Sequence, residues 1–291
     1  MLTGSLKGDI EYQLRHGHMA TKLILLNVAV FIVVSFFRVI GFFTGWDAVT
    51  ALMLRECMAS GSMAEVVRHP WSLLLYQFFH IQFFHLLFNM LWLYWFAEVF
   101  VLYQGEKRIL SVYLLGGLIG WVLFALAMNF IPVLQQRGPG LLLGASAGIM
   151  AIVWAAVALH PSHMFNLLFI GPVKIVYVAA ASLLVDFFAI ADGEAGTYFA
   201  HLGGALLGFG YVKLLQSGWD IFSPIDAVAS LFKKRSKLQT AHVGQAAPRA
   251  SSRSTDDQKR ADEILDKISR SGYDSLSKEE KDFLFKYSNK L

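Results

Sequence analysis

The chain has 291 residues, of which 56% are hydrophobic and 16% are charged, and its mean hydropathy is +0.51. These values exclude an ordinary soluble enzyme and are typical of a protein with several membrane spans. The net charge of +4 does not indicate a nucleic-acid partner, because the basic residues gather at alternate ends of the apolar segments.

We expect an all-α polytopic membrane protein, in which a bundle of six transmembrane helices precedes a small helical C-terminal extension. Six segments are long and apolar enough to cross a bilayer, at about 22–40, 81–103, 109–130, 146–160, 175–191 and 198–215. The fourth is short, so it needs protein neighbours. The connection 41–79 and the stretch 163–174 are rich in apolar and aromatic residues, which predicts interfacial segments.

The composition divides the chain into four regions. They are a cytoplasmic N-terminal leader (1–21), the six-span core (22–216), an interfacial segment with a flexible linker (217–255) and a cytoplasmic two-helix extension (256–291). No signal peptide is apparent, because the first apolar run lacks a small-residue cleavage site. The positive-inside rule predicts cytoplasmic termini, and we expect a multi-pass protein of the bacterial inner membrane.

Polar residues occur at the start of the second, fourth and sixth apolar segments. The second carries His80, His85 and Asn89, the fourth begins at Ser146, and the sixth carries His201. From a cytoplasmic N-terminus, these three segments all run from outside to inside. At about 1.5 Å rise per residue, their polar side chains therefore lie within roughly the outer third of the bilayer.

The spacing within the segments predicts that these side chains converge. His85 and Asn89 are four residues apart and share a helix face. Gly204 and Gly208 form a small-xxx-small pair that allows close approach of another helix, and small residues follow Ser146. Tight packing of the fourth and sixth segments would bring His201 toward the serine.

A serine beside a histidine indicates nucleophilic acyl transfer, with His201 as the base for Ser146. Donors for the oxyanion are available from the Asn89 amide, a His85 N–H and the backbone N–H of Ser146. No carboxylate has an evident position beside His201, so we expect a dyad. Asp186, in the fifth segment, is expected either to extend its side chain toward the membrane surface or to pair with another polar group.

These residues form three motifs: H-x4-H-x3-N at 80–89, G-x-S at 144–146 and A-H-x2-G-x3-G at 200–208. Their ordered combination resembles the rhomboid family of intramembrane serine proteases over about residues 20–216. The resemblance implies a six-helix bundle, a water-filled cavity open outward and single-pass membrane proteins as substrates. It also implies Ser146 as nucleophile, His201 as its base and His85 and Asn89 as oxyanion donors; the supporting positions are Gly144, His80, Gly204 and Gly208.

The chain departs from the common family pattern at three positions. Ala147 replaces the second glycine of G-x-S-G, Ser72 follows Trp71 where arginine is common, and Met150 stands where an aromatic residue often follows the serine by four. These changes affect loop anchoring and packing around the base, and therefore rate and substrate choice more than chemistry.

Two other functional classes are considered. A non-proteolytic rhomboid-like protein that binds transmembrane helices is expected to lose the serine or the histidine, whereas this chain keeps both. A transporter is disfavoured because matched broken helices and paired intramembrane charges are not evident. No Cys/His cluster has metal-ligand spacing, so no metal or other cofactor is expected. Two roles stay open for His80: it could line the cavity and bind water, or it could anchor a loop.

The extension is predicted to form two short helices separated by Gly272. Ser254 or Thr255 could cap the first, and Ser277 with Glu280 forms a capping box for the second. One shared apolar face is expected from Ile264, Leu265, Ile268, Phe283, Leu284 and Tyr287. This face is too small for a very stable core, so docking to a cytoplasmic partner or to the membrane body stays open.

Overall fold

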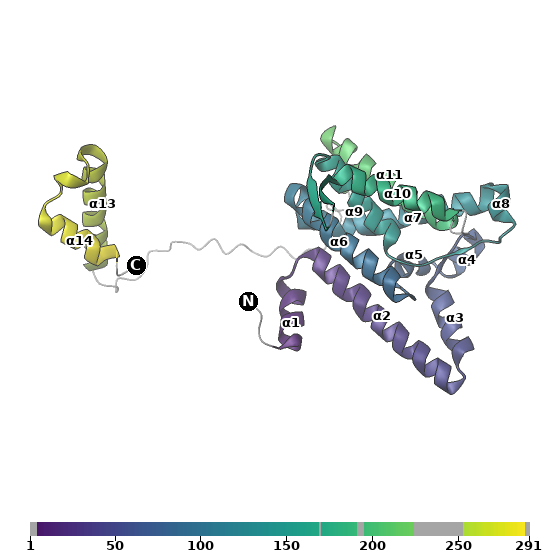
Figure 1. The fold of residues 1–291 in the computed structure, drawn as a ribbon. Helices are drawn as coiled ribbons and strands as arrows, with labels where there is room; N and C mark the ends of the chain where they lie inside the picture. The colour runs from purple at the N-terminus through teal and green to yellow at the C-terminus, as the bar shows by residue number, and fades with distance from the viewer. Residues whose placement is uncertain (1–4, 169, 191–194, 224–252, 289–291) are drawn as a thin grey trace. The chain divides into compact units, whose positions relative to one another are not determined.

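The computed structural model describes residues 5–168, 170–190, 195–223 and 253–288. The chain divides into two compact units, residues 1–232 and 233–291 (Figure 1). The helices of the first unit are α1 (Leu6–His16), α2 (Met19–Thr44), α3 (Asp47–Cys57), α4 (Met63–Arg68), α5 (Ser72–Leu75), η1 (Tyr76–Phe78), α6 (Phe83–Gln104), η2 (Glu106–Arg108), α7 (Ile109–Phe130), α8 (Pro132–Gln135), α9 (Ser146–Leu159), α10 (Ile175–Ala189) and α11 (Ala195–Gln216). Its strands are β1 (Ala59–Ser60), β2 (Leu141–Leu142), β3 (Met164–Leu167) and β4 (Gly171–Lys174).

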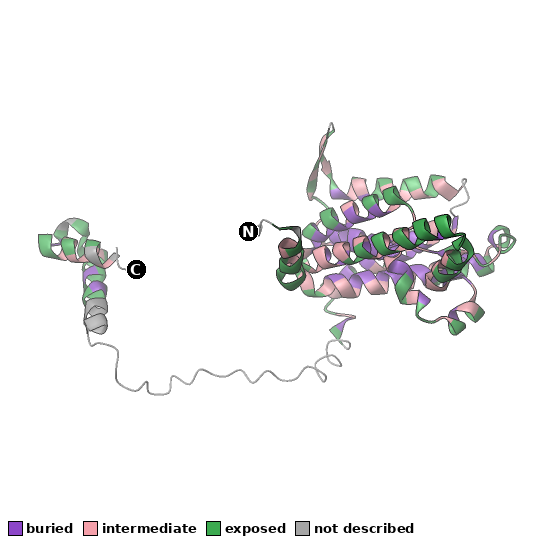
Figure 2. Cartoon of the chain, turned by 90° about the horizontal axis from the view of Figure 1, so that it is seen from below, coloured by how far each residue is buried: buried purple, intermediate pink, exposed green. Residues whose placement is uncertain are grey.

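Helix α9 forms the centre of the first unit. Its 14 residues rise only about 21 Å, which is less than the roughly 30 Å of a bilayer core. Most of them are buried, because α9 packs against α6, α7 and α11. Figure 2 shows the buried residues inside the unit and the exposed ones along its outer helices. The expectation that this short apolar segment needs protein neighbours is confirmed.

The glycines of α11 allow the close approach to α9 that their spacing predicts. A Cβ atom on Gly204 would lie 2.0 Å from the carbonyl oxygen of Ala147, and one on Gly208 would lie 1.9 Å from that of Ala151. Any larger residue at either position would force the helices apart. The packing of α11 on α9 therefore depends on the absence of side chains at these two positions.

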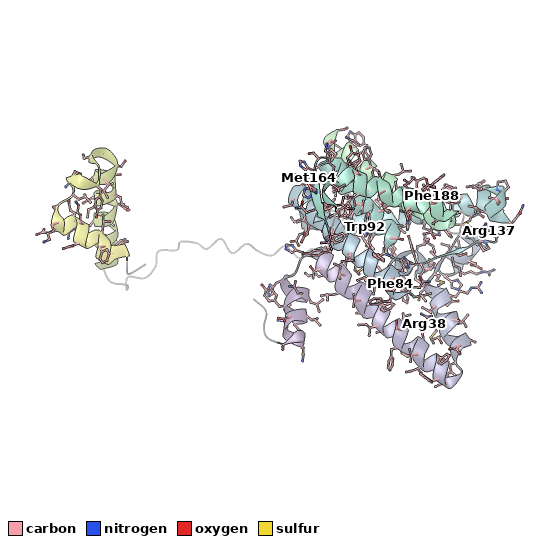
Figure 3. All side chains as sticks on the ribbon, in the orientation of Figure 1. Arg38, Phe84, Trp92, Arg137, Met164 and Phe188 are labelled. Atoms are coloured by element: carbon pink, nitrogen blue, oxygen red, sulfur yellow. The ribbon has the colours of Figure 1, made fainter. Side chains whose placement is uncertain are left out.

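Among the residues that the structure describes, three helical stretches are long and apolar enough to cross a membrane: Met19–Thr44, Phe83–Gln104 and Glu106–Phe130. The apolar helices α9 and α10 are shorter. Aromatic side chains such as Phe84 on α6 and Phe188 on α10 are about two-thirds exposed at the surface of the unit (Figure 3). A surface of this kind suits lipid rather than water, as expected of an integral membrane protein.

The connection between α2 and α6 is folded against the region that precedes α9. Strand β1 pairs antiparallel with β2, with Ser60 opposite Leu141. The indole N–H of Trp121 donates to the carbonyl oxygen of Ser60 at 2.9 Å, and the amide of Asn129 donates to that of Gly61 at 2.8 Å. These bonds attach the connection to α7 and to the strand just before the serine.

The stretch 163–174, which is expected to be interfacial, forms an antiparallel hairpin. Strands β3 and β4 pair from Met164 opposite Lys174 to Leu167 opposite Gly171. Gly171 adopts a φ of +87°, which suits the turn. The Phe165 ring packs edge-on against Phe96 of α6, with 5.1 Å between the ring centroids. Exposed and half-buried residues alternate along β3, as expected of a strand with one face toward the core. The sequence Met164–Leu167 does not alternate between apolar and polar residues, so it did not predict this strand.

The second unit contains α13 (Arg253–Ser271), η4 (Tyr273–Ser275) and α14 (Lys278–Ser288). The predicted capping box is present: the backbone N–H of Ser277 donates to Glu280 Oε2 at 2.7 Å, and the N–H of Glu280 donates to Ser277 Oγ at 3.3 Å. Gly272, with a φ of +77°, ends the first helix. Two helices separated by Gly272 are thus confirmed.

Two details of the extension differ from expectation. Helix α13 begins at Arg253, so Ser254 and Thr255 are its second and third residues and do not occupy the N-cap position. Ile264 is buried, whereas Leu265 is 53% exposed and does not belong to the shared face. One residue along a helix rotates the side chain by about 100°, which explains why these neighbours differ. Most of the expected linker lies outside the described residues.

Candidate active site

The turn before α9 presents Ser146 as the first residue of that helix. Gly144 has a φ of +118°, and its N–H donates to the carbonyl oxygen of Tyr76 at 2.9 Å. The Tyr76 hydroxyl in turn donates to the carbonyl oxygen of Gly117 on α7 at 2.7 Å. A Cβ atom on Gly144 would lie 2.8 Å from Cε1 of His85. The turn therefore requires glycine both for its backbone conformation and for the histidine packed against it.

His85 and Asn89 extend from the first two turns of α6 and line the same cavity as Ser146. The Asn89 side-chain amide donates to the backbone carbonyl of His85 at 2.8 Å. Because an amide nitrogen carries two hydrogens, this bond occupies one N–H and leaves the other for a ligand. The bond also holds the amide at a defined position on the helix face that both residues share.

His80 lies in the connection before α6, outside the spanning helices, and its side chain is fully buried. Its Nε2 accepts a hydrogen bond from the backbone N–H of Ala145 at 3.4 Å, and its ring centroid lies 5.1 Å from that of His85. Burial, together with the nearby His85, lowers the pKa of His80 to about 4. Of the two alternatives for His80, the contact with the serine turn favours the loop anchor.

The expectation that no carboxylate lies beside His201 is wrong. Asp186 of α10 places Oδ2 at 2.7 Å from Nδ1 of His201 on α11. Both side chains are largely shielded from solvent, with exposed fractions of 22% and 11%. Asp186 lies near the end of α10 and His201 in the second turn of α11, and these consecutive helices pack together. The pairing depends on how the two helices meet, which spacing along the sequence did not specify.

One cavity of about 330 Å³ brings the predicted site residues together. Its lining comprises His85, Phe88, Asn89, Trp92, Ser146, Ile149, Met150, Ser182, Val185, Asp186 and His201. His201 Nε2 is buried and, among the described residues, has no hydrogen-bond partner. The side chains of Ser146 and His201 thus share a cavity without a hydrogen bond between them, and such bonds often tighten only when substrate is bound.

The supporting residues that sequence reasoning selected lie around this cavity rather than in its lining. Gly144 and His80 shape the turn before Ser146, and Gly204 and Gly208 set the distance between α9 and α11. Ser182 also lines the cavity but was not expected from the sequence, and its hydroxyl donates to the carbonyl oxygen of Ala179 at 2.7 Å. A lone serine in an apolar helix gives little signal, because such back-bonding is common.

The residues that depart from the family pattern occupy three different surroundings. Met150 belongs to the cavity lining, and the carbonyl of Ala147 lies against Gly204. Ser72 is buried at the start of α5, while the preceding Trp71 donates its indole N–H to the carbonyl oxygen of Glu56 at 3.1 Å. This bond anchors the connection between α2 and α6 beside Ser72, which stands where other family members commonly have arginine.

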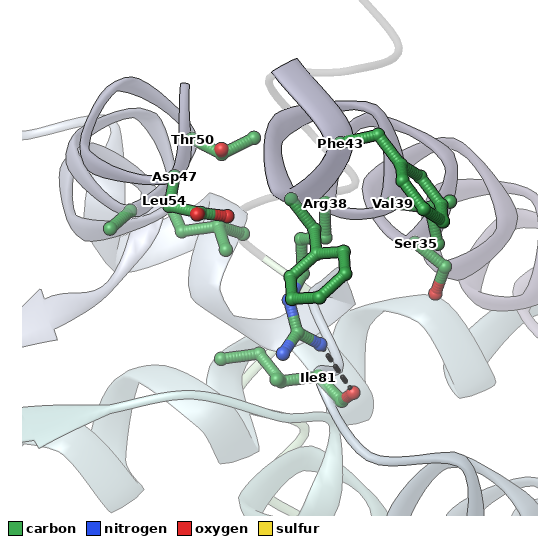
Figure 4. A pocket seen from close by; sticks show the side chains of 10 residues that line it. Ser35, Arg38, Val39, Phe43, Asp47, Thr50, Leu54 and Ile81 are labelled. Carbon is green, nitrogen blue, oxygen red and sulfur yellow. Dashed lines mark hydrogen bonds between the residues drawn. The ribbon is translucent and has the colours of Figure 1, made fainter. Parts of the chain in front are cut away.

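A larger cavity, of about 630 Å³, lies between α2, α3 and the segment before α6. Figure 4 shows Arg38 reaching toward Ile81, whose carbonyl oxygen accepts a hydrogen bond from the guanidinium at 3.0 Å. Asp47 and Thr50 of α3 complete its polar lining together with Ser35. None of the described residues that line this cavity is a histidine, so it does not combine a serine with a histidine base as the smaller cavity does.

Comparison with known proteins gives two matches to family models. A model described as "Rhomboid domain" matches residues 67–217, and one described as "Family of unknown function (DUF6576)" matches residues 249–290. The chain is also similar to "RHOMBOID-like protein 12, mitochondrial" from Arabidopsis thaliana, with 30% identity over 138 residues. The alignment covers 44% of this chain and 41% of that protein, so the chain spans about two fifths of the length of this curated relative.

Proposed function

The chain belongs to the rhomboid family, and from this premise we propose that it is an intramembrane serine endopeptidase that cleaves transmembrane segments of single-pass membrane proteins near the outer membrane face. The observation that carries the proposal is the cavity that Ser146, His201, His85 and Asn89 line together from three separate helices. Members of the family are generally proteases, and this cavity combines a nucleophile, a base and hydrogen-bond donors.

In the proposed reaction, His201 Nε2 takes the hydroxyl proton of Ser146 while Oγ attacks the carbonyl carbon of the scissile peptide bond. A tetrahedral intermediate forms. The resulting imidazolium then protonates the leaving amine as the C–N bond breaks, which leaves an acyl group on Ser146. Water, deprotonated by His201, hydrolyses this ester and restores the serine. Two observations support these roles: Ser146 is half-buried, and His201 Nε2 has no hydrogen-bond partner among the residues that the structure describes.

The negative charge of the intermediate needs hydrogen-bond donors in the cavity. The second N–H of the Asn89 amide and a ring N–H of His85 are proposed to supply two, and the backbone N–H of Ser146 a third. As the first residue of α9, Ser146 has no intrahelical partner for its N–H, and the helix dipole favours negative charge there. Removal of one such donor commonly reduces turnover by about 10²–10³-fold.

We further propose the six-span topology, with α2, α6, α7, α9, α10 and α11 as the spans and both termini in the cytoplasm. The site lies where α6, α9 and α11 begin, and these alternate helices would then all start at the outer face. The bacterial inner membrane is the proposed location. The second unit matches a family of unknown function. We propose that it binds a cytoplasmic partner and takes no part in catalysis.

The test is proteolysis of a generic transmembrane substrate by the full-length protein in liposomes. Ser146→Ala and His201→Ala are each expected to abolish cleavage while the protein stays folded. A fluorophosphonate reagent should label Ser146, and Ser182, the other serine in the cavity lining, should stay unlabelled. Cleavage by the Ser146→Ala variant at the wild-type rate would refute the proposal.

The alternative is a rhomboid-like protein that binds transmembrane helices without cleaving them, and the name of the Arabidopsis relative is compatible with either. The two functions separate in the same assay. A protein that captures the substrate helix equally well with and without Ser146, and releases no product, would belong to the alternative class.

A further inference from the structure

We propose that Asp186 is a positioning residue that holds the imidazole of His201 in the orientation and tautomer that the reaction needs. This inference rests on the proposed proteolytic function and extends the expected pair of residues to three. The carboxylate and the ring lie on different helices, α10 and α11, and Oδ2 is 2.7 Å from Nδ1. Both groups also line the cavity that contains Ser146.

The contact selects one tautomer of the ring. A carboxylate oxygen accepts a hydrogen bond, so Nδ1 carries the hydrogen and Nε2 presents a lone pair. Nε2 is also the nitrogen that is buried and, within the described part of the chain, unpartnered. It is therefore in the form that can take a proton from Ser146. The opposite tautomer would place a hydrogen on Nε2 and could not act as a base.

The contact also restrains the ring and favours the charged intermediate. Asp186 lies across from His201 on a separate helix, so the hydrogen bond fixes ring rotation that the α11 backbone alone leaves free. When Nε2 takes the serine proton, the imidazolium gains a carboxylate neighbour in a shielded site, where the attraction is stronger than in water. In the Ser-His-Asp arrangement, the acidic residue acts through the same two effects.

A purely structural explanation is that the pair only ties α10 to α11. The two roles predict different results. A tie would stabilise the fold and could be replaced by any side chain that preserves packing. A positioning residue must accept a hydrogen bond from Nδ1, and its loss should lower kcat while leaving KM and the folded state nearly unchanged.

The experiment compares Asp186→Ala, Asp186→Asn and Asp186→Glu with wild type, using the full-length protein in liposomes and a transmembrane substrate. Tyr177→Phe, an exposed position of the same helix, is the matched control. We expect the Ala and Asn variants to lose about 10²–10⁴-fold in kcat, with KM changed by less than about threefold. Asn removes the charge without changing size and can direct an N–H at Nδ1. Glu keeps the carboxylate and should recover part of the activity.

Thermal unfolding of each variant in detergent and its rate of labelling by a fluorophosphonate complete the test. Slow labelling of Ser146 in folded Asn and Ala variants is the expected result. Activity within threefold of wild type in either variant, or a loss that merely follows the loss of folded protein, would overturn the role of Asp186. The proposed function itself fails separately, if wild type neither cleaves substrate nor is labelled at Ser146.

Discussion

Replacement of Gly204 by alanine tests whether the distance between α9 and α11 controls the reaction. The new Cβ atom would lie 2.0 Å from the carbonyl oxygen of Ala147, whereas real Cβ atoms essentially never approach closer than 3.0 Å. The helices must therefore separate locally by about 1 Å. Ala147 follows Ser146 directly, and Gly204 lies one helical turn from His201, so the separation acts on both reacting groups.

The expected effect follows from this displacement. Overpacking of a buried site usually costs about 1–3 kcal/mol of stability, and a misplacement of about 1 Å between reacting groups can cost about 10²-fold in rate. We therefore expect Gly204→Ala to lower turnover by about 10²-fold while most of the protein stays folded. Turnover of a transmembrane substrate in liposomes and thermal unfolding in detergent measure the two effects separately.

Gly210→Ala is the matched control on the same helix, because its Cβ atom would meet nothing within 4 Å. Alanine is a better helix former than glycine by about 1 kcal/mol, so this variant should keep full activity and equal or higher stability. If Gly204→Ala also retained wild-type turnover, the reasoning that close packing of α9 and α11 aligns the site would be refuted.

Three further predictions concern the donors, the extension and a buried histidine. Asn89→Ala should lower kcat by about 10²–10³-fold with little change in KM; normal turnover in steady-state assays would remove Asn89 from the oxyanion site. Truncation after Leu238 should leave cleavage of a generic substrate largely intact, because every described residue that lines the cavity belongs to the first unit; complete loss of cleavage in a folded, inserted truncation would contradict this. The pKa of His80 is lowered from 6.5 to about 4, so the unfolded chain binds more protons in this interval and stability should fall as the pH decreases from 6.5 toward 4. Thermal unfolding across this range should show a smaller decrease for His80→Asn, and an equal decrease would argue against a neutral buried His80.

The sequence alone predicted the class of the protein and its long apolar helices, because apolar composition and helical periodicity are local properties. The apolar segment expected at 109–130 corresponds to α7, which has the same bounds. The capping box of Ser277 and Glu280 was also predictable, because its two hydrogen bonds join residues three apart. The spacing and the order of the motif residues also indicated one family, although the distances between these residues in space were unknown.

The grouping of the site was partly predictable from helix geometry. Alternate helices start at the same end of a bundle, so polar residues in the first turns of three such helices were expected to meet. The close approach of α11 to α9 was also predictable, because the sequence shows where glycines leave a helix face without side chains. What the spacing left open was the direction of each hydrogen bond, such as that from the Asn89 amide to the backbone of His85.

Only the tertiary structure decided which groups pair across helices. Asp186 and His201 are 15 residues apart, and the sequence specifies neither the angle nor the rotation at which their helices pack. The pairing of β1 with β2, which braces the turn before Ser146, likewise joins segments about 80 residues apart. Such contacts arise when whole elements pack, so the partner of a residue depends on the angle and the rotation at which its element meets the neighbouring one. The carboxylate beside the base therefore became visible only when the helices were assembled.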